Sequence, residues 1–160
     1  MGLPAPAAPP PTAADLARGL GRLFWAAGAV VQGEFTLACG RRADLAVLWP
    51  SGELALVEIK VRAADLHADT KWPDYLDWCD RFFWAVPPHL AARLDAPGFA
   101  PGRAGLIVAD RHGAVLVRDA RATPLPAARR RAMQLRFARA AAARLMCAAD
   151  PALAAGDAAL

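Results

Sequence analysis

At 160 residues the chain is long enough for one domain with a substantial hydrophobic core. Its net charge of +4 and pI near 9.5 permit a polyanionic partner without requiring one. No apolar run could cross a bilayer and no signal segment is recognisable at the start of the sequence, so we expect no membrane contact and a cytoplasmic protein. The three cysteines lack metal-ligand spacing, which indicates reduced thiols.

The first predicted elements are a tail, a helix and a strand. Residues 1–11 are a Pro/Ala-rich tail that we expect to be disordered. Thr12 and Asp15 have the spacing of a capping box, which predicts a helix from there to about Gly28. A strand is predicted over residues 30–38. The helix carries one apolar stripe, formed by Leu16, Leu20, Leu23, Phe24 and Ala27.

Residues 42–61 predict two strands joined by the three-residue turn 50–52. With this loop, residues whose numbers sum to 102 lie opposite each other, so Asp44 faces Glu58 on one side of the hairpin. Lys60, two residues beyond Glu58, projects to the same side. A register slip of one residue would separate these groups.

The two faces of this hairpin differ. One face is apolar along its whole length and should pack on a helix: it carries Leu45, Val47, Trp49, Ala55, Val57, Ile59 and Val61. The other face becomes charged at Asp44, Glu58 and Lys60. Two carboxylates about 5 Å apart repel by roughly 3 kcal/mol at an effective dielectric constant of 20. Lys60, a raised pKa or a divalent cation could offset that repulsion, and an ordinary surface ion pair is the alternative interpretation.

The remaining chain predicts a helix over residues 71–80 with Thr70 as its N-cap, and an Asp80–Arg81 ion pair. Trp72, Trp78 and Trp84 fit a core by their spacing, with stacking on bases as the alternative. Further on we expect a buried strand at 82–87, a short helix at 89–94, a strand hairpin at 105–118, a long helix at 126–148 and a tail at 149–160.

Three segments carry a family resemblance. Gly40-Arg-Arg-Ala-Asp44, Val57-Glu-Ile-Lys60 and the block of residues 71–87 resemble the MmcB-like family of predicted bacterial DNA repair endonucleases. The same acidic and lysine pattern resembles the PD-(D/E)XK nuclease superfamily. The resemblance implies an α/β fold with a restriction-endonuclease-like mixed sheet, an αβββαβ core flanked by helices, and an added C-terminal hairpin and long helix. Residues 12–148 would form this single nuclease-like domain.

Within that resemblance, Asp44, Glu58, Lys60 and Glu34 are the implied catalytic residues. Asp44, Glu58 and the backbone carbonyl of Ile59 are the implied ligands of Mg²⁺ or Mn²⁺. The implied function is a metal-dependent DNA endonuclease that hydrolyses phosphodiester bonds in repair. The alternative is a catalytically silent nuclease-fold module that binds DNA or a repair protein.

The expected partners are DNA, other DNA repair proteins and a second copy of the chain in a homodimer, with the protein on the nucleoid when bound. The expected phosphate contacts are Arg41, Arg42, Arg62 and Lys71, which flank the motif. The arginine cluster 129–131 is either a DNA clamp or a solvated helix face.

Overall fold

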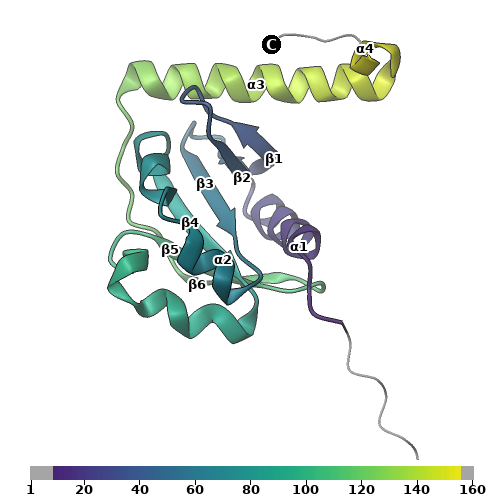
Figure 1. Cartoon of the computed structure of the whole chain (residues 1–160). Helices are drawn as coiled ribbons and strands as arrows, with labels where there is room; N and C mark the ends of the chain where they lie inside the picture. Colours follow the sequence, from purple (N-terminus) through teal and green to yellow (C-terminus); the bar gives the residue numbers. More distant parts are fainter. Residues whose placement is uncertain (1–8, 156–160) are drawn as a thin grey trace, which may run out of the picture.

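The computed structural model describes residues 9–155 (Figure 1). Most of the predicted N-terminal tail, residues 1–8, and residues 156–160 lie outside the described part. No described helix is both long and apolar enough to span a membrane. The elements are α1 (Ala13–Ala26), β1 (Val30–Thr36), β2 (Arg42–Leu48), β3 (Leu54–Ile59), α2 (Ala63–Ala68), the 3-10 helix η1 (Trp72–Asp77), β4 (Arg81–Val86), the 3-10 helices η2 (Pro88–Asp95) and η3 (Pro97–Phe99), β5 (Gly105–Ala109), β6 (Ala114–Arg118), α3 (Ala127–Ala149) and α4 (Ala152–Ala155).

The six strands form one sheet in the order β1-β2-β3-β4-β5-β6. The β1–β2, β2–β3 and β5–β6 pairs are antiparallel, whereas β3–β4 and β4–β5 are parallel. The chain reaches β4 through α2 and η1, as a parallel crossover requires. The predicted mixed α/β sheet is therefore confirmed, and the long C-terminal helix is present as α3.

Helix α1 begins at the predicted capping box. The Thr12 hydroxyl accepts a hydrogen bond from the Asp15 N–H at 3.2 Å, and the Asp15 carboxylate accepts one from the Thr12 N–H at 2.8 Å. The buried side of α1 packs on the apolar face of the β2–β3 hairpin, in a cluster that includes Leu16, Leu20 and Val47. Both the helix and the surface it covers are thus as predicted.

The β2–β3 hairpin has the predicted register. Leu45 pairs with Val57 and Leu48 with Leu54, and the Trp49 N–H donates to the Glu53 carbonyl at 3.1 Å to close the three-residue loop. The tight loop depends on Gly52, whose φ of +84° is in the left-handed region. Continued by one residue on each strand, this register places Asp44 opposite Glu58. The two side chains therefore lie on the same side of the sheet.

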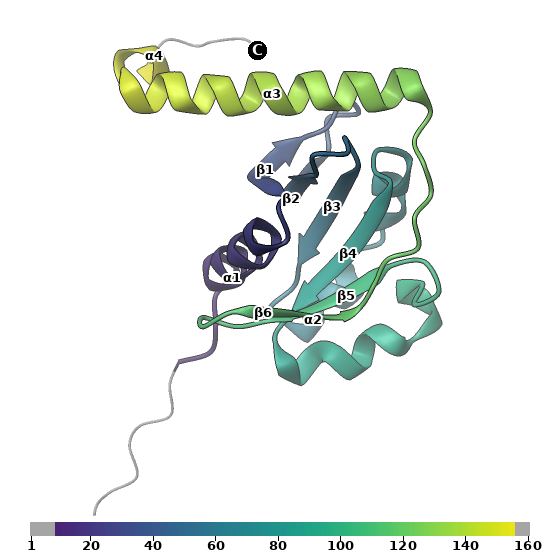
Figure 2. The ribbon, with the colours of Figure 1, turned by 180° about the vertical axis from the view of Figure 1, so that it is seen from behind.

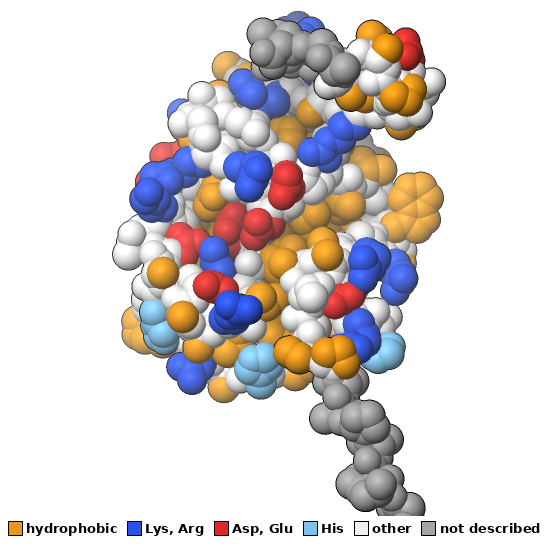
Figure 3. Space-filling view, turned by 45° about the vertical axis from the view of Figure 1, so that its right-hand side comes forward, with side chains coloured by type: hydrophobic (Ala, Val, Ile, Leu, Met, Phe, Trp, Pro, Cys, Tyr) orange, Lys and Arg blue, Asp and Glu red, His pale blue; other side chains and the backbone are white. Residues whose placement is uncertain are grey.

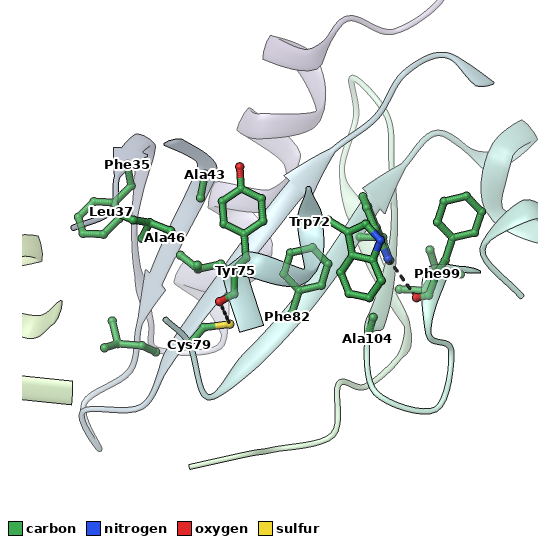
Figure 4. Packing of buried hydrophobic residues seen from close by; sticks show 14 of the residues in the cluster. Phe35, Leu37, Ala43, Ala46, Trp72, Tyr75, Cys79, Phe82, Phe99 and Ala104 are labelled. Carbon is green, nitrogen blue, oxygen red and sulfur yellow. Dashed lines mark hydrogen bonds between the residues drawn. The ribbon is translucent and has the colours of Figure 1, made fainter. Parts of the chain in front are cut away.

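The opposite face of the sheet holds an aromatic core (Figure 4). Trp72 stacks on Phe82 with ring centroids 5.4 Å apart, and the Trp84 indole N–H donates to the Phe99 carbonyl at 3.3 Å. Trp78 is half-buried, with the Arg129 guanidinium 5.2 Å from its ring centroid. The core interpretation is correct for Trp72 and Trp84.

The segment between β3 and β4 differs from the prediction. Helix α2 was not predicted, and the expected helix over residues 71–80 is the shorter 3-10 helix η1. The N-cap residue of η1 is Lys71, not Thr70. An Asp69 carboxylate oxygen accepts hydrogen bonds from the N–H groups of Lys71 at 3.1 Å and Trp72 at 3.0 Å, so Asp69 binds the free N–H groups at the start of this element.

Asp80 and Arg81 do not form the predicted ion pair, because neighbouring residues at a strand start point in opposite directions. Asp80, only 3% exposed, pairs with Arg130 of α3 through contacts of 2.6 and 2.9 Å. Arg81 instead contacts Glu53 and, at 3.1 Å, Asp119.

Helix α3 lies across the sheet at β1, and its C-terminal half and α4 extend beyond the strand (Figures 1 and 2). Met133 and Phe137 anchor it in the aromatic core. Arg129 donates to the Asp77 carbonyl at 2.8 Å. Because Arg130 holds Asp80 as well, two of the three arginines at 129–131 have structural contacts.

Candidate active site

Asp44, Glu58 and Lys60 converge on one face of the sheet, where β3 ends. The same strands place Ala46 and Leu56 in the core on that face, and alternation carries the charged side chains to the same side. The regular β2–β3 pairing stops at Leu45 and Val57. Beyond it, an Asp44 carboxylate oxygen accepts the Ile59 N–H at 2.7 Å, so the side chain continues the ladder and is fixed in orientation.

The ammonium of Lys60 bridges two carboxylates. Its Nζ lies 3.2 Å from Glu58 Oε2 and 2.7 Å from Asp69 Oδ2, and its side chain is 15% exposed. Asp69 is held in place because its other oxygen caps η1. Sequence reasoning missed Asp69; an aspartate at the start of a short helix signals a cap, but nothing local signals its contact with Lys60.

Glu58 is the most constrained acid of the group. Its residue is 4% exposed, and within the described structure its Oε1 is buried without a hydrogen-bond partner. Burial, followed by the negative charge of Asp44, raises the pKa of Glu58 to about 7. Burial also raises the pKa of Asp44. The pair is therefore poised to take up either a proton or a cation.

Lys60 keeps its proton in this arrangement. Burial alone would lower the pKa of Lys60, but the contacts with Asp69 and Glu58 outweigh burial and raise the pKa above its ordinary value. The site thus contains a fixed ammonium rather than a neutral amine. This conflicts with a role for Lys60 as a general base, which would need a lowered pKa.

Tyr75 of η1 packs beside the site and was not predicted. Its hydroxyl donates to the Arg42 carbonyl at 2.9 Å, which ties η1 to the start of β2. Burial and the nearby charge of Glu58 raise the pKa of Tyr75, so the phenol remains neutral. Tyr75 lies among the core residues labelled in Figure 4.

Glu34 lies at the surface beside the site. Its φ of +50° is irregular for a strand, and the β1–β2 pairs on either side of it, Gly33 with Leu45 and Phe35 with Ala43, pass over Glu34 and Asp44. Consequently Gln32 and Phe35, three residues apart, both contact Phe137 of α3. The Glu34 side chain is 70% exposed, and its Oε2 lies 3.5 Å from an Arg42 nitrogen.

The four residues predicted to contact phosphate differ in how exposed they are. Arg41 is half-buried and pairs with Asp74 at 2.7 Å, whereas Arg42, Arg62 and Lys71 are exposed. Figure 3 shows a face on which acidic side chains gather near the centre and Lys and Arg side chains surround them.

The site has few side chains that could bind a metal ion. Across residues 9–155, no group of three or more His, Cys, Asp or Glu side chains is arranged to hold a metal ion. A cation at this site would rest on the carboxylates of Asp44 and Glu58 with backbone oxygen. Oxygen donors of this kind suit Mg²⁺ or Mn²⁺.

Comparison with known proteins places the chain in a family. The model of the MmcB-like family, described as DNA repair protein MmcB-like, matches residues 6–152. No curated protein matches the chain. A solved structure of the SPO1766 protein of unknown function from Silicibacter pomeroyi is 41% identical, with a TM-score of 0.80, and the match covers 91% of this chain and 94% of that one. The chain therefore belongs to the MmcB-like family of DNA repair proteins.

Proposed function

We propose that this protein is a divalent-metal-dependent DNA endonuclease of the PD-(D/E)XK type that acts in DNA repair. Membership of a DNA repair family supports DNA as the substrate. One observation carries the chemistry: a buried carboxylate oxygen of Glu58 has no partner and lies beside a second acid, Asp44, whose pKa is also raised. Burying an acid without a partner is costly, so such a group signals a missing ligand.

The residues fit a magnesium or manganese ion. Asp44 and Glu58 would supply one carboxylate each, and the carbonyl of Ile59 would be the backbone ligand. When bound, the ion supplies Lewis-acid polarisation of the scissile phosphate. A cation would give the orphaned oxygen a partner and would relieve the repulsion between the two acids, so the donor set suits a metal ion as well as a proton.

The chain itself supplies charge and orientation. Lys60 presents a protonated amine beside the carboxylates and can stabilise negative charge that develops on the phosphate. Asp69 fixes the direction of that amine through a contact of 2.7 Å. Tyr75 fixes the backbone of Arg42 at the edge of the site. Lys60 therefore acts as a cation and a hydrogen-bond donor to water or phosphate, not as the base.

A second candidate is a silent nuclease-fold module that binds DNA or a repair protein. The observation in its favour is that Lys60 already has two acidic partners, Glu58 and Asp69, at ion-pair distance. In a silent module, these contacts would persist and stabilise the fold without chemistry.

Cleavage assays separate the two. The purified protein is incubated with Mg²⁺ or Mn²⁺ and with duplex, single-stranded, flap, junction and damaged DNA. We expect cleavage of at least one substrate, reduced at least about 100-fold in Glu58→Gln and Lys60→Ala. Asp65→Asn, an exposed acid on the neighbouring α2, is the matched control. Absence of cleavage on every substrate, or cleavage by Glu58→Gln equal to that by the parent, would refute the proposed endonuclease activity.

A further inference from the structure

A groove of about 450 Å³ runs between β1 and α3. Its walls are apolar in the depth of the groove and basic at the rim. Its apolar lining consists of the core residues Phe35 and Met133, which are 2% and 1% exposed, together with the half-buried Trp78 and the 61% exposed Leu135. The rim carries Arg136, Arg139 and Arg144. The core accounts for Phe35 and Met133, but neither the core nor the carboxylate site accounts for the exposed Leu135 beside three arginines.

The positive charge of the rim is not neutralised. Helix α3 contains six arginines and no acidic residue. Arg136 and Arg144 donate to the β1 carbonyls of Thr36 and Gly33, at 3.4 and 2.5 Å, contacts that orient the side chains and leave their charge in place. Arg139 makes no hydrogen bond or ion pair to any residue between 9 and 155. The groove thus offers anchored guanidinium groups to an anion.

The groove opens beside the carboxylate site. Its β1 wall pairs directly with the start of β2, Phe35 with Ala43 and Thr36 with Arg42, and the next residue of β2 is Asp44. Glu34 lines the groove and its carboxylate contacts Arg42, so the acidic group on the lining is paired with a cation. A chain lying in the groove would therefore lead to the candidate catalytic residues on the same face of the sheet.

We propose that this groove binds a single-stranded segment of the DNA substrate, an inference that rests on the proposed function. Guanidinium groups would hold the phosphates, and unstacked bases would contact the apolar walls. Arg136 and Arg144 are about 12 Å apart along the helix axis, which is enough for more than one phosphate. A duplex keeps its bases stacked inside and cannot use the apolar part of the groove.

Binding without catalysis tests this inference. Fluorescence anisotropy with a labelled 20-nucleotide single strand is measured in EDTA across a salt series. Each lost phosphate contact lowers the salt slope of a single strand by about 0.7, which is about a fivefold loss of affinity near 0.1 M salt. We expect this loss in Arg139→Gln. Arg139→Lys should keep the slope, because its charge is retained. Arg131→Gln, an exposed arginine of the same helix outside the groove, is the matched control and should bind as the parent does.

Three further nucleic acids test what the groove recognises. An abasic strand of equal length should bind about tenfold more weakly, because stacking is lost while the phosphates remain, and a blunt duplex should also bind more weakly. Equal slopes for Arg139→Gln and Arg131→Gln, tighter binding of the duplex, or tighter binding of a matched RNA strand would overturn the assignment. Groove binding is measured in EDTA, where no cleavage takes place, so loss of cleavage and loss of groove binding remain separate results.

Discussion

Replacing Glu58 by Gln should make the protein more stable while removing its activity. Glu58 is a buried carboxylate next to Asp44, and Gln has nearly the same shape without the charge. The substitution removes both the desolvation of the charged form and the repulsion between the two acids. Lys60 keeps its contact with Asp69 at 2.7 Å, so its ammonium still has one carboxylate partner.

The magnitude follows from linkage. Each pKa unit is worth about 1.4 kcal/mol, so raising the pKa of Glu58 from 4.5 to about 7 corresponds to about 3–4 kcal/mol. The folded state binds this proton more tightly than the unfolded state does. The stability of the parent therefore falls as the pH rises from about 4.5 to 7, and the cost is complete above pH 7. For a chain of this size, about 3–4 kcal/mol corresponds to about 6–16 °C in Tm.

The assay is urea unfolding in EDTA at several pH values between 4.5 and 8.5. Glu58→Gln should match the parent near pH 4.5 and exceed it by about 3–4 kcal/mol at pH 8, and Mg²⁺ should narrow the gap by stabilising only the parent. Asp65→Asn is the control, because that acid is exposed on α2. Parallel curves of stability against pH for the parent and Glu58→Gln would show that Glu58 is not destabilised by its burial, and so would a variant less stable than the parent at pH 8.

The remaining predictions concern the groups around this acid. Asp69→Asn should weaken the hold on Lys60 and cost about 2 kcal/mol in urea unfolding, with cleavage reduced more than DNA binding by anisotropy; unchanged cleavage would exclude Asp69 as the positioning group. Arg130→Met should destabilise by about 3–5 kcal/mol, because it leaves the Asp80 carboxylate buried with two backbone N–H donors but without a cation; a melting temperature equal to that of the parent would contradict this. Binding of Mg²⁺ at pH 6.5 should release a proton from Glu58 and be weaker than at pH 8, as calorimetry in buffers of different ionisation enthalpy would show; affinity that does not change with pH would contradict it.

The hairpin and its acids could be predicted because local rules decide them. The turn residues set a three-residue loop, the loop sets the register, and the register places Asp44 beside Glu58. The capping box at Thr12 likewise fixes where α1 begins. These features depend on residues close together in sequence or directly opposite in a ladder.

The partners that come from distant segments could not be predicted. Asp69 reaches Lys60 only because α2 and η1 fold back over the end of β3, and no periodicity encodes that return. Arg130 pairs with Asp80 although the two residues are 50 positions apart in the sequence. The predicted ion pair between Asp80 and Arg81 was therefore wrong. Glu34 fits a strand by composition, but its φ of +50° is not encoded in any local pattern.

The metal centre is tested most directly by calorimetric titration of Mn²⁺ into the metal-free protein and into Asp44→Asn and Glu58→Gln. We expect one ion per chain in the parent, a loss of that binding in both variants, and unchanged binding in Asp65→Asn. Absence of binding in the parent, or binding that survives in both site variants, would contradict a metal centre formed by the two acids.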